Sequence, residues 1–195
     1  MTIQLLPTVT HDLDAPRAGV VATRLAELMG LYERPPMRRV DRELLGSVIE
    51  AAAEAGVAEQ VAARRDAAAP GEATIHAFLD ALIGSPRPAA EIASLLAIFG
   101  YGELERLSGA SEGSLRRYAA EARVTPDPVA RRVHFLATIV AILRGSFNEF
   151  GIRRWFERPH PALDGTPPAE LLTVGVEPDD ERGQTVLAAA LALLA

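Results

Sequence analysis

The segment from Val129 to Leu143, VARRVHFLATIVAIL, constrains the fold of this chain more than any other. Its apolar residues recur three and four positions apart, which is the spacing of an α-helix. They also occupy two faces of that helix, one with Val133 and Val140 and the other with Phe135. Because a helix that is apolar on two sides must be covered on both, the sequence predicts that it lies in the centre of a helical bundle or in a dimer interface.

Prolines and glycines divide the rest of the chain into segments with the same helical spacing. One helix is expected from Arg17 to the Pro35-Pro36 pair, and a longer one from an N-cap at Asp41 to Val61. Residues 1–16 are expected to form a loose arm and residues 66–73 a linker. The best strand candidate, LLTVGV, is short, so the predicted fold class is all-α, a helical bundle of about nine helices.

Composition agrees with closely packed helices and limits the classes of function. Of the 195 residues, 49% are hydrophobic and only 5% are aromatic, with many of the good helix formers alanine and leucine. The net charge of −6 argues against a general nucleic-acid binder. The charge is uneven, however, because residues 100–160 hold ten arginines and seven acidic residues, whereas the flanking segments are acidic. The sequence therefore predicts a weakly basic region in the middle of the chain.

Several kinds of chemistry lack the residues they need. The chain has no cysteine, which excludes disulfides, thiolate nucleophiles and cysteine-based zinc sites. The four histidines are scattered and no nucleophile constellation is visible, so we expect no metal, no cofactor and no enzymatic activity. The N-terminus lacks the features of a signal peptide, and the final apolar run is too short to span a bilayer. We therefore expect a cytoplasmic protein with no membrane contact.

Residues 103–118, ELERLSGASEGSLRRY, have the spacing of a helix-turn-helix. Leu104 and Leu107 pack one helix, Gly109 supplies a left-handed turn, and Leu115 returns to the core after a cap at Ser111. In such units the second helix enters the DNA major groove. The predicted DNA-binding residues are Arg106, Ser111, Ser114, Arg116, Arg117 and Arg123.

An ordinary helical hairpin explains the same pattern. Spacing of this kind is common in helical bundles, and Glu112 at the start of the second helix repels phosphate. The sequence leaves the two interpretations of residues 103–118 open.

The stretch GIRRWFERPHPALDGTPPAELL, residues 151–172, contains the only tryptophan. Trp155 is expected to be buried within its own domain, which forces Arg153 and Arg154 outward. Arginine beside tryptophan is also typical of interface hot spots. The proline-rich loop is stiff, so we expect it to present Leu163 to solvent at a low entropic cost.

Together with GSFNEF before it and ERGQTVLAAALALL after it, this stretch resembles the toxin-binding domain of the Xre/MbcA/ParS class of antitoxins. The resemblance covers residues 87–195 and includes the helix-turn-helix and the central helix. The matching residues are Trp155, Phe156, Pro159, Leu163, Gly165, Glu170, Leu171, Leu172, Gly183, Val186 and Leu187.

The resemblance implies a type II antitoxin that binds a cognate RES-domain toxin and blocks its NAD-consuming site. Many members also bind their own promoter DNA as homodimers. It further implies three regions: residues 1–86 of unknown role, residues 87–145 with the helix-turn-helix and a central dimerisation helix, and residues 146–195 as the toxin-binding domain. The expected toxin-binding residues are Arg153, Arg154, Trp155, Phe156, Arg158, Pro159, Leu163, Leu171 and Leu172.

Three features depart from the family pattern. Pro167 stands where the family commonly has Ser or Thr before the proline that starts the penultimate helix, and Thr166 lies one residue earlier, where it is a candidate cap. The polar tail that follows the last helix in many relatives is absent from this sequence, and residues 1–86 have no counterpart. A DNA-binding transcriptional regulator with no toxin partner therefore remains the alternative function.

Overall fold

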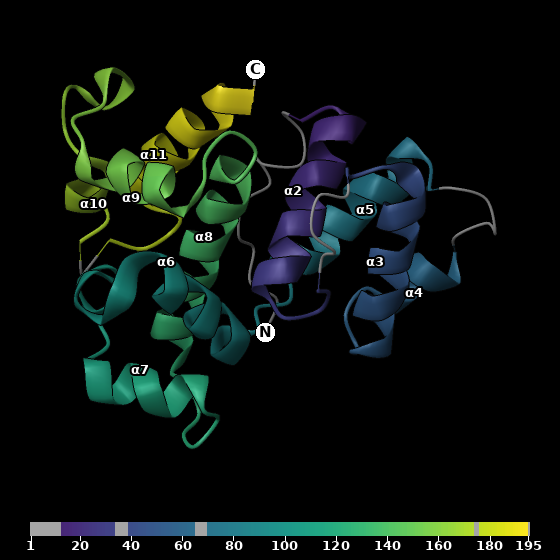
Figure 1. Cartoon of the computed structure of the whole chain (residues 1–195), viewed down its shortest axis with the longest axis horizontal. Helices are drawn as coiled ribbons and strands as arrows, with labels where there is room; N and C mark the ends of the chain where they lie inside the picture. The colour runs from purple at the N-terminus through teal and green to yellow at the C-terminus, as the bar shows by residue number, and fades with distance from the viewer. Residues whose placement is uncertain (1–12, 34–38, 65–69, 174–175, 195) are drawn as a thin grey trace. The chain divides into compact units, whose positions relative to one another are not determined.

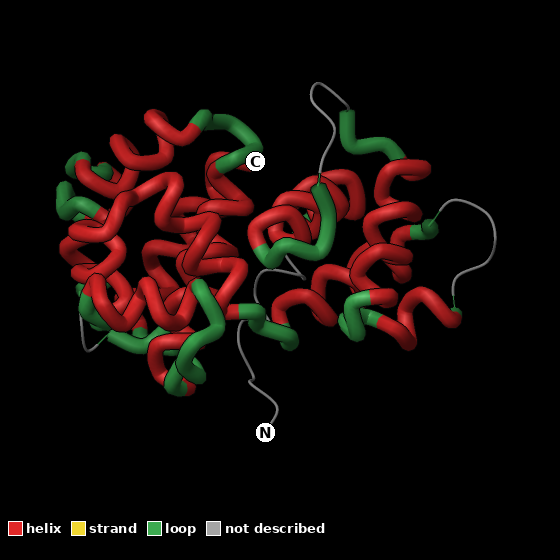
Figure 2. Tube along the Cα trace, turned by 60° about the horizontal axis from the view of Figure 1, so that its bottom comes forward, coloured by secondary structure: helices red, strands yellow, loops and turns green. Residues whose placement is uncertain are grey.

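The computed structural model describes residues 13–33, 39–64, 70–173 and 176–194. Every regular element in these ranges is a helix and none is a strand, which confirms the predicted all-α class (Figure 2). The chain divides into two compact units, Met1–Pro86 and Arg87–Ala195. Residues 87–145 and 146–195, which were expected as two regions, lie within one of these units.

The first unit contains four helices among its described residues: α2 (Ala15–Leu28), α3 (Arg42–Glu54), α4 (Glu59–Ala63) and α5 (Glu72–Ile83). Asp14 caps α2 by accepting a hydrogen bond from the backbone N–H of Arg17 at 3.0 Å. Helices α2 and α5 pack side by side (Figure 1). At Gly19 of α2 an added Cβ would lie only 3.3 Å from the side chain of Leu45, so the small residue lets α3 approach closely.

Several predicted boundaries in this unit are wrong. The helix expected from Asp41 to Val61 ends at Glu54, and after a turn at Gly56 the separate α4 begins. Helix α2 begins before Arg17 and ends at Leu28, well ahead of the Pro35-Pro36 pair, which lies outside the described residues. Of the expected arm, residues 1–12 lie outside the described part, whereas Leu13 is buried. Of the expected linker, residues 66–69 lie outside it, and residues 72–73 belong to α5.

The second unit is built around one buried helix. Its elements are α6 (Pro88–Ser108), α7 (Glu112–Ala119), α8 (Asp127–Leu143), α9 (Glu149–Glu157), a 3-10 turn η1 (Pro161–Leu163), α10 (Pro168–Leu171), α11 (Glu181–Leu191) and a 3-10 turn η2 (Ala192–Leu194). Every residue of α8 from Val133 to Leu143 is buried, and α6 and α11 pack against it (Figure 1). The predicted central helix is therefore confirmed.

Helix α6 consists of two straight pieces joined at Gly100. The backbone of Gly100 has a φ of 71°, which side-chain-bearing residues rarely adopt. The first piece packs with its apolar side chains, such as Ile92 and Leu95, in the core of the unit. The second piece, after Gly100, leads into α7.

Candidate functional site

The second piece of α6 and the short α7 form a helical hairpin. Gly109 has a φ of 74°, which confirms the predicted left-handed turn. Ser111 caps α7 by accepting a hydrogen bond from the backbone N–H of Ser114 at 3.4 Å. Leu107 and Leu115 are buried between the hairpin and the rest of the unit. The hairpin therefore has the inward packing expected from its leucine spacing.

The arginines of this hairpin are exposed, and two of them are paired with glutamates. Arg106 donates two hydrogen bonds to Glu103, at 3.1 and 2.9 Å, and Arg116 forms an ion pair with Glu112. The hydrogen bonds that Arg106 donates to Glu103 raise the pKa of Arg106, and partial burial opposes this rise. Some of the N–H donors of both arginines are therefore already bound to glutamates of the same hairpin.

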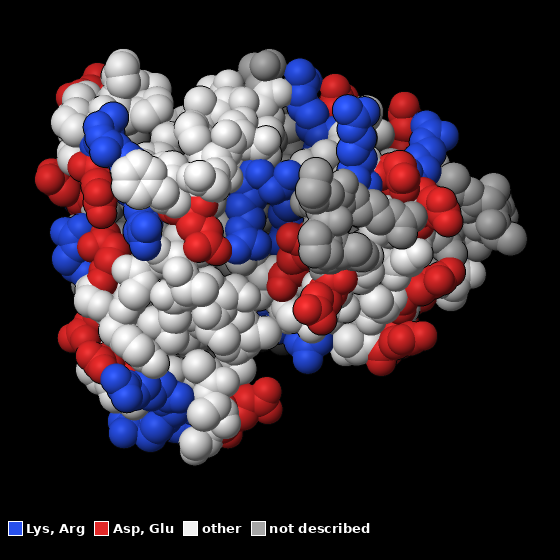
Figure 3. Space-filling model, viewed as in Figure 1, with Lys and Arg blue, Asp and Glu red and all other residues white. Residues whose placement is uncertain are grey.

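Two of the exposed arginines lie over aromatic rings. The guanidinium of Arg116 also lies over the ring of Tyr101, at 4.8 Å from its centroid, and that of Arg123 lies over Tyr118 at 6.0 Å. Arg117 is exposed and forms no ion pair among the described residues. Figure 3 shows the arginines over α7 as a basic patch at the lower left. Because residues 103–123 hold four arginines and four glutamates, the local net charge is nevertheless zero.

Five of the six predicted DNA-binding residues lie on this hairpin, and the sixth, Arg123, lies in the loop after α7. Arg106, Ser111, Arg116, Arg117 and Arg123 are exposed, and Ser114 is half-buried. Their contact with DNA stays a prediction. The glutamates that accompany them weaken the positive field that phosphate binding requires.

Helix α9 has one side fixed in the core. Ile152, Trp155 and Phe156 are buried, and Trp155 is only 7% exposed, which confirms its predicted burial. The ring of Phe156 lies edge-on to the rings of Phe99, at 4.9 Å, and Trp155, at 5.2 Å. The indole Nε1 of Trp155 is buried and has no hydrogen-bond partner among the described residues. This aromatic cluster fixes the orientation of α9.

The opposite side of α9 presents arginines without carboxylate partners. Arg153 and Arg158 are exposed and Arg154 is half-buried, and none of the three forms an ion pair within the described residues. Arg153 donates a long hydrogen bond, 3.4 Å, to the carbonyl of Ile98. The guanidinium of Arg154 lies over the ring of Phe150, 5.4 Å from its centroid.

Phe150 is a candidate functional residue that the sequence analysis missed. Its side chain is 57% exposed, which is unusual for a large hydrophobic residue. The helical spacing in the sequence could have indicated its exposure. Residues 150 and 154 are one helical turn apart and lie opposite Trp155 and Phe156 on a helix.

The loop after α9 differs from the expectation. Leu163 was expected to face solvent, but it is only 4% exposed. The reason is the 3-10 turn η1, which is capped by His160 and turns Leu163 back against α11. Leu172 is also buried, Leu171 is half-buried and Pro159 is exposed. Of the nine expected toxin-binding residues, Trp155, Phe156, Leu163 and Leu172 are thus core residues of the unit.

Helix α10 begins without a side-chain cap. It starts at Pro168 with Pro167 in the N-cap position, so Thr166 does not cap it. The expectation that Thr166 caps this helix is therefore wrong, and no side chain among the described residues caps the start of α10.

Two arginines at the start of α8 form ion pairs with the same glutamate. Arg131 and Arg132 converge on one carboxylate, that of Glu177, with distances of 3.1 and 2.7 Å. Glu177 is held in turn by its backbone N–H, which donates to Asp180 at 2.8 Å. The segment before α11 is thereby fixed to α8.

The core of the second unit also contains a buried polar pair. Glu91 of α6 and His134 of α8 are fully buried, and Glu91 Oε1 lies 2.6 Å from His134 Nδ1. The same oxygen accepts a hydrogen bond from the backbone N–H of Arg87 at 3.2 Å. The other oxygen, Oε2, is buried and accepts no hydrogen bond from the described residues. The sequence analysis found no partner for His134, because the two residues are 43 positions apart.

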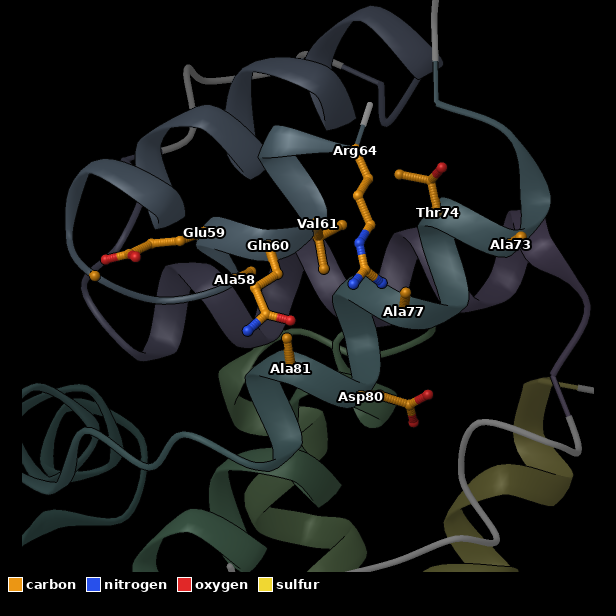
Figure 4. A pocket seen from close by; sticks show the side chains of 11 residues that line it. Ala58, Glu59, Gln60, Val61, Arg64, Ala73, Thr74, Ala77, Asp80 and Ala81 are labelled. Atoms are coloured by element: carbon orange, nitrogen blue, oxygen red, sulfur yellow. The ribbon is translucent and has the colours of Figure 1, made fainter. Parts of the chain in front are cut away.

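The first unit contains an open groove of about 840 Å³ between α4 and α5. Figure 4 shows Ala77 and Ala81 of α5 beneath Gln60 and Arg64. Its lining mixes small apolar side chains with charges of both signs, among them Arg64 and Asp80. This arrangement does not identify a class of ligand.

Two further searches concern metals and membranes. Within the described ranges, no group of three or more His, Cys, Asp or Glu side chains is placed to hold a metal ion. No single helix there is long and apolar enough to cross a membrane; only α5 and α6 taken together, across the break between them, reach the required length and composition.

Comparisons with protein-family models, with curated proteins and with solved structures found no match to this chain.

Proposed function

We propose that this protein is the antitoxin of a type II toxin–antitoxin system and that its second unit binds and neutralises a RES-domain toxin. The observation that carries the proposal is the two-sided character of α9. Trp155 and Phe156 fix one side in the core, while Arg153, Arg154 and Arg158 lie outside that core and form no ion pair among the described residues. A helix held in this way, with arginines that have no carboxylate partner among the described residues, is suited to protein recognition.

The sequence resemblance supports the same proposal. Its matching residues lie on α9, η1, α10 and α11, which follow one another within a single compact unit. Several of them, including Leu163 and Gly183, are buried. These residues act by building the scaffold rather than by touching the toxin.

Inhibition would follow from contact alone. The antitoxin would cover the NAD-consuming site of the toxin, with arginine forks pairing with carboxylates of the toxin. No cofactor and no catalytic residue of the antitoxin take part. A homodimer would present the α9 surface twice and so increase the avidity for an oligomeric toxin.

Co-expression tests the proposal. A RES-domain protein encoded beside this gene is produced with and without the full-length chain, and growth and co-purification are measured. We expect the chain to restore growth and to co-purify with the toxin. Failure of both readouts would remove the proposal.

A second candidate function is DNA binding by the α7 hairpin. It is favoured by Arg117 and Arg123, which are exposed and form no ion pair among the described residues. Binding to the promoter is measured at increasing salt concentration, where phosphate contacts produce a steep loss of affinity. Absence of binding at low salt would exclude this function and leave the antitoxin proposal intact.

A further inference from the structure

The exposed side of α9 carries an aromatic residue, Phe150, whose side chain lies outside the core of the unit. Phe150 is 57% exposed, and the core side of the helix is already filled by Ile152, Trp155 and Phe156. At 100° per residue, Phe150 lies opposite those three residues. Its ring is therefore available to another molecule.

The first turn of α9, which carries Phe150, has a side-chain cap. Asn148 accepts a hydrogen bond from the backbone N–H of Gly151 at 2.9 Å. A Cβ at Gly151 would lie 3.0 Å from Cβ of Phe147, so the glycine allows Phe147 to pack across this turn. The guanidinium of Arg154 lies over the Phe150 ring, 5.4 Å from its centroid. The backbone that presents Phe150 is therefore ordered before a partner binds, which lowers the entropic cost of binding.

The charges around the ring indicate the chemistry of the partner. Arg106, Arg116, Arg131 and Arg132 have glutamate partners, whereas Arg117 and Arg123 form no ion pair among the described residues. Arg153 and Arg154 also form no ion pair there, although the chain has 26 acidic and 20 basic residues, and they differ in lying next to the exposed ring of Phe150. In a protein with an excess of carboxylates, arginines left without partners at an exposed aromatic ring fit an acidic surface.

We propose that Phe150, stacked on Arg154, is the anchor of the toxin-binding surface, and that its counterpart on the toxin is an apolar pocket bordered by carboxylates. This inference rests on the proposed antitoxin function. Phe150 fills the pocket, and Arg153 and Arg154 pair with the carboxylates at its border. The contact therefore combines a desolvated aromatic centre with a charged rim.

The test compares full-length variants for binding to the purified RES-domain protein encoded beside the gene. The variants are Phe150→Ala, Arg154→Ala and, as a matched control, Val124→Ala, because Val124 is 88% exposed and lies in the loop before α8. Affinity is measured by titration calorimetry at two salt concentrations. Circular dichroism and thermal melting check that each variant is folded.

We expect Phe150→Ala to weaken binding by about tenfold or more and Val124→Ala to leave it unchanged. Arg154→Ala should weaken binding less and reduce its salt dependence. Unchanged affinity of a folded Phe150→Ala variant, while the wild type binds, overturns the inference alone. Failure of the wild type to bind overturns the proposed function and the inference with it.

A second copy of the chain is the competing occupant of this surface. Sedimentation velocity of the wild type and of Phe150→Ala distinguishes the two. A dimer that dissociates in Phe150→Ala, with toxin affinity unchanged, would assign the surface to self-association and overturn the inference.

Discussion

Helices α7 and α9 both carry arginines on exposed faces of the same unit, but the surroundings of those arginines differ. On the α7 hairpin, Arg106 and Arg116 are bound to glutamates one turn away, whereas Arg117 forms no ion pair among the described residues. On α9, Arg153 and Arg154 form no ion pair among the described residues, and the exposed Phe150 lies beneath the guanidinium of Arg154. The number of arginines is therefore a poor guide to a binding surface. The feature that separates α9 from α7 is the exposed Phe150 beside arginines that form no ion pair among the described residues.

The largest effect is expected from a variant that tests whether the buried aromatic cluster keeps α9 folded and so keeps its exposed side in place. Trp155→Ala removes a ring that contacts Phe156 and His160, and it should lower the free energy of unfolding of the second unit by about 3–5 kcal/mol. Urea denaturation followed by circular dichroism measures the loss. Arg158→Ala is the matched control on the exposed end of α9, and it should change stability by less than about 0.5 kcal/mol. Equal stability of the two variants would show that the aromatic cluster does not support α9.

A smaller effect is expected at the cap of α7. Ser111→Ala removes the oxygen that accepts the backbone N–H of Ser114, and it should cost about 1 kcal/mol. Hydrogen exchange at the amides of the first turn of α7 measures it, with Ser146→Ala, another exposed serine, as the control. Faster exchange confined to α7 is expected. A uniform change across the unit would show that α7 is not a locally capped hairpin.

The two helices are compared most directly by replacing one arginine from each, Arg154 of α9 and Arg116 of α7. Arg154→Ala and Arg116→Ala should each change the free energy of unfolding by less than about 0.5 kcal/mol, because Arg116 is exposed, Arg154 is only half-buried, and neither belongs to a buried ion pair among the described residues. In the toxin co-purification assay only Arg154→Ala should reduce recovery. Loss of recovery with Arg116→Ala instead would move the binding surface to the α7 hairpin.

The smallest effect concerns the Arg106–Glu103 pair. Its hydrogen bonds raise the pKa of Arg106, so the stabilisation is present at low pH and is lost only as pH rises through that raised pKa. Arginine titrates far above neutral pH, so the contribution should stay constant between pH 6 and pH 9. Glu103→Gln should lower stability by a few tenths of a kcal/mol at both values, because the pair is largely exposed. A difference that grows with pH in this range would contradict this account.

The parts of the fold that depend on local pattern were predictable from the sequence. The spacing of apolar residues in 129–143 predicted the buried α8, and Gly109 predicted the turn before α7. The break at Gly56 was not predicted, because the apolar spacing continues through it and only the φ of 80° ends the helix.

Features that depend on residues distant in sequence were missed. Leu163 was expected outside because its proline-rich loop is polar, but contacts with α11 bury it. The arginines of α9 were predicted to face outward and do so, whereas Phe150 was overlooked because a phenylalanine is normally assigned to the core. Which arginines lack carboxylate partners also depends on the three-dimensional arrangement.

The buried contact between Glu91 and His134 has a consequence for how this sequence can change over evolutionary time. Replacing one of the two leaves the other buried without this contact, which is destabilising, whereas replacing both by apolar residues of similar size is close to neutral. Substitutions at positions 91 and 134 are therefore coupled. Descendants of this gene should keep both residues or lose both together, and lineages that carry only one should be rare.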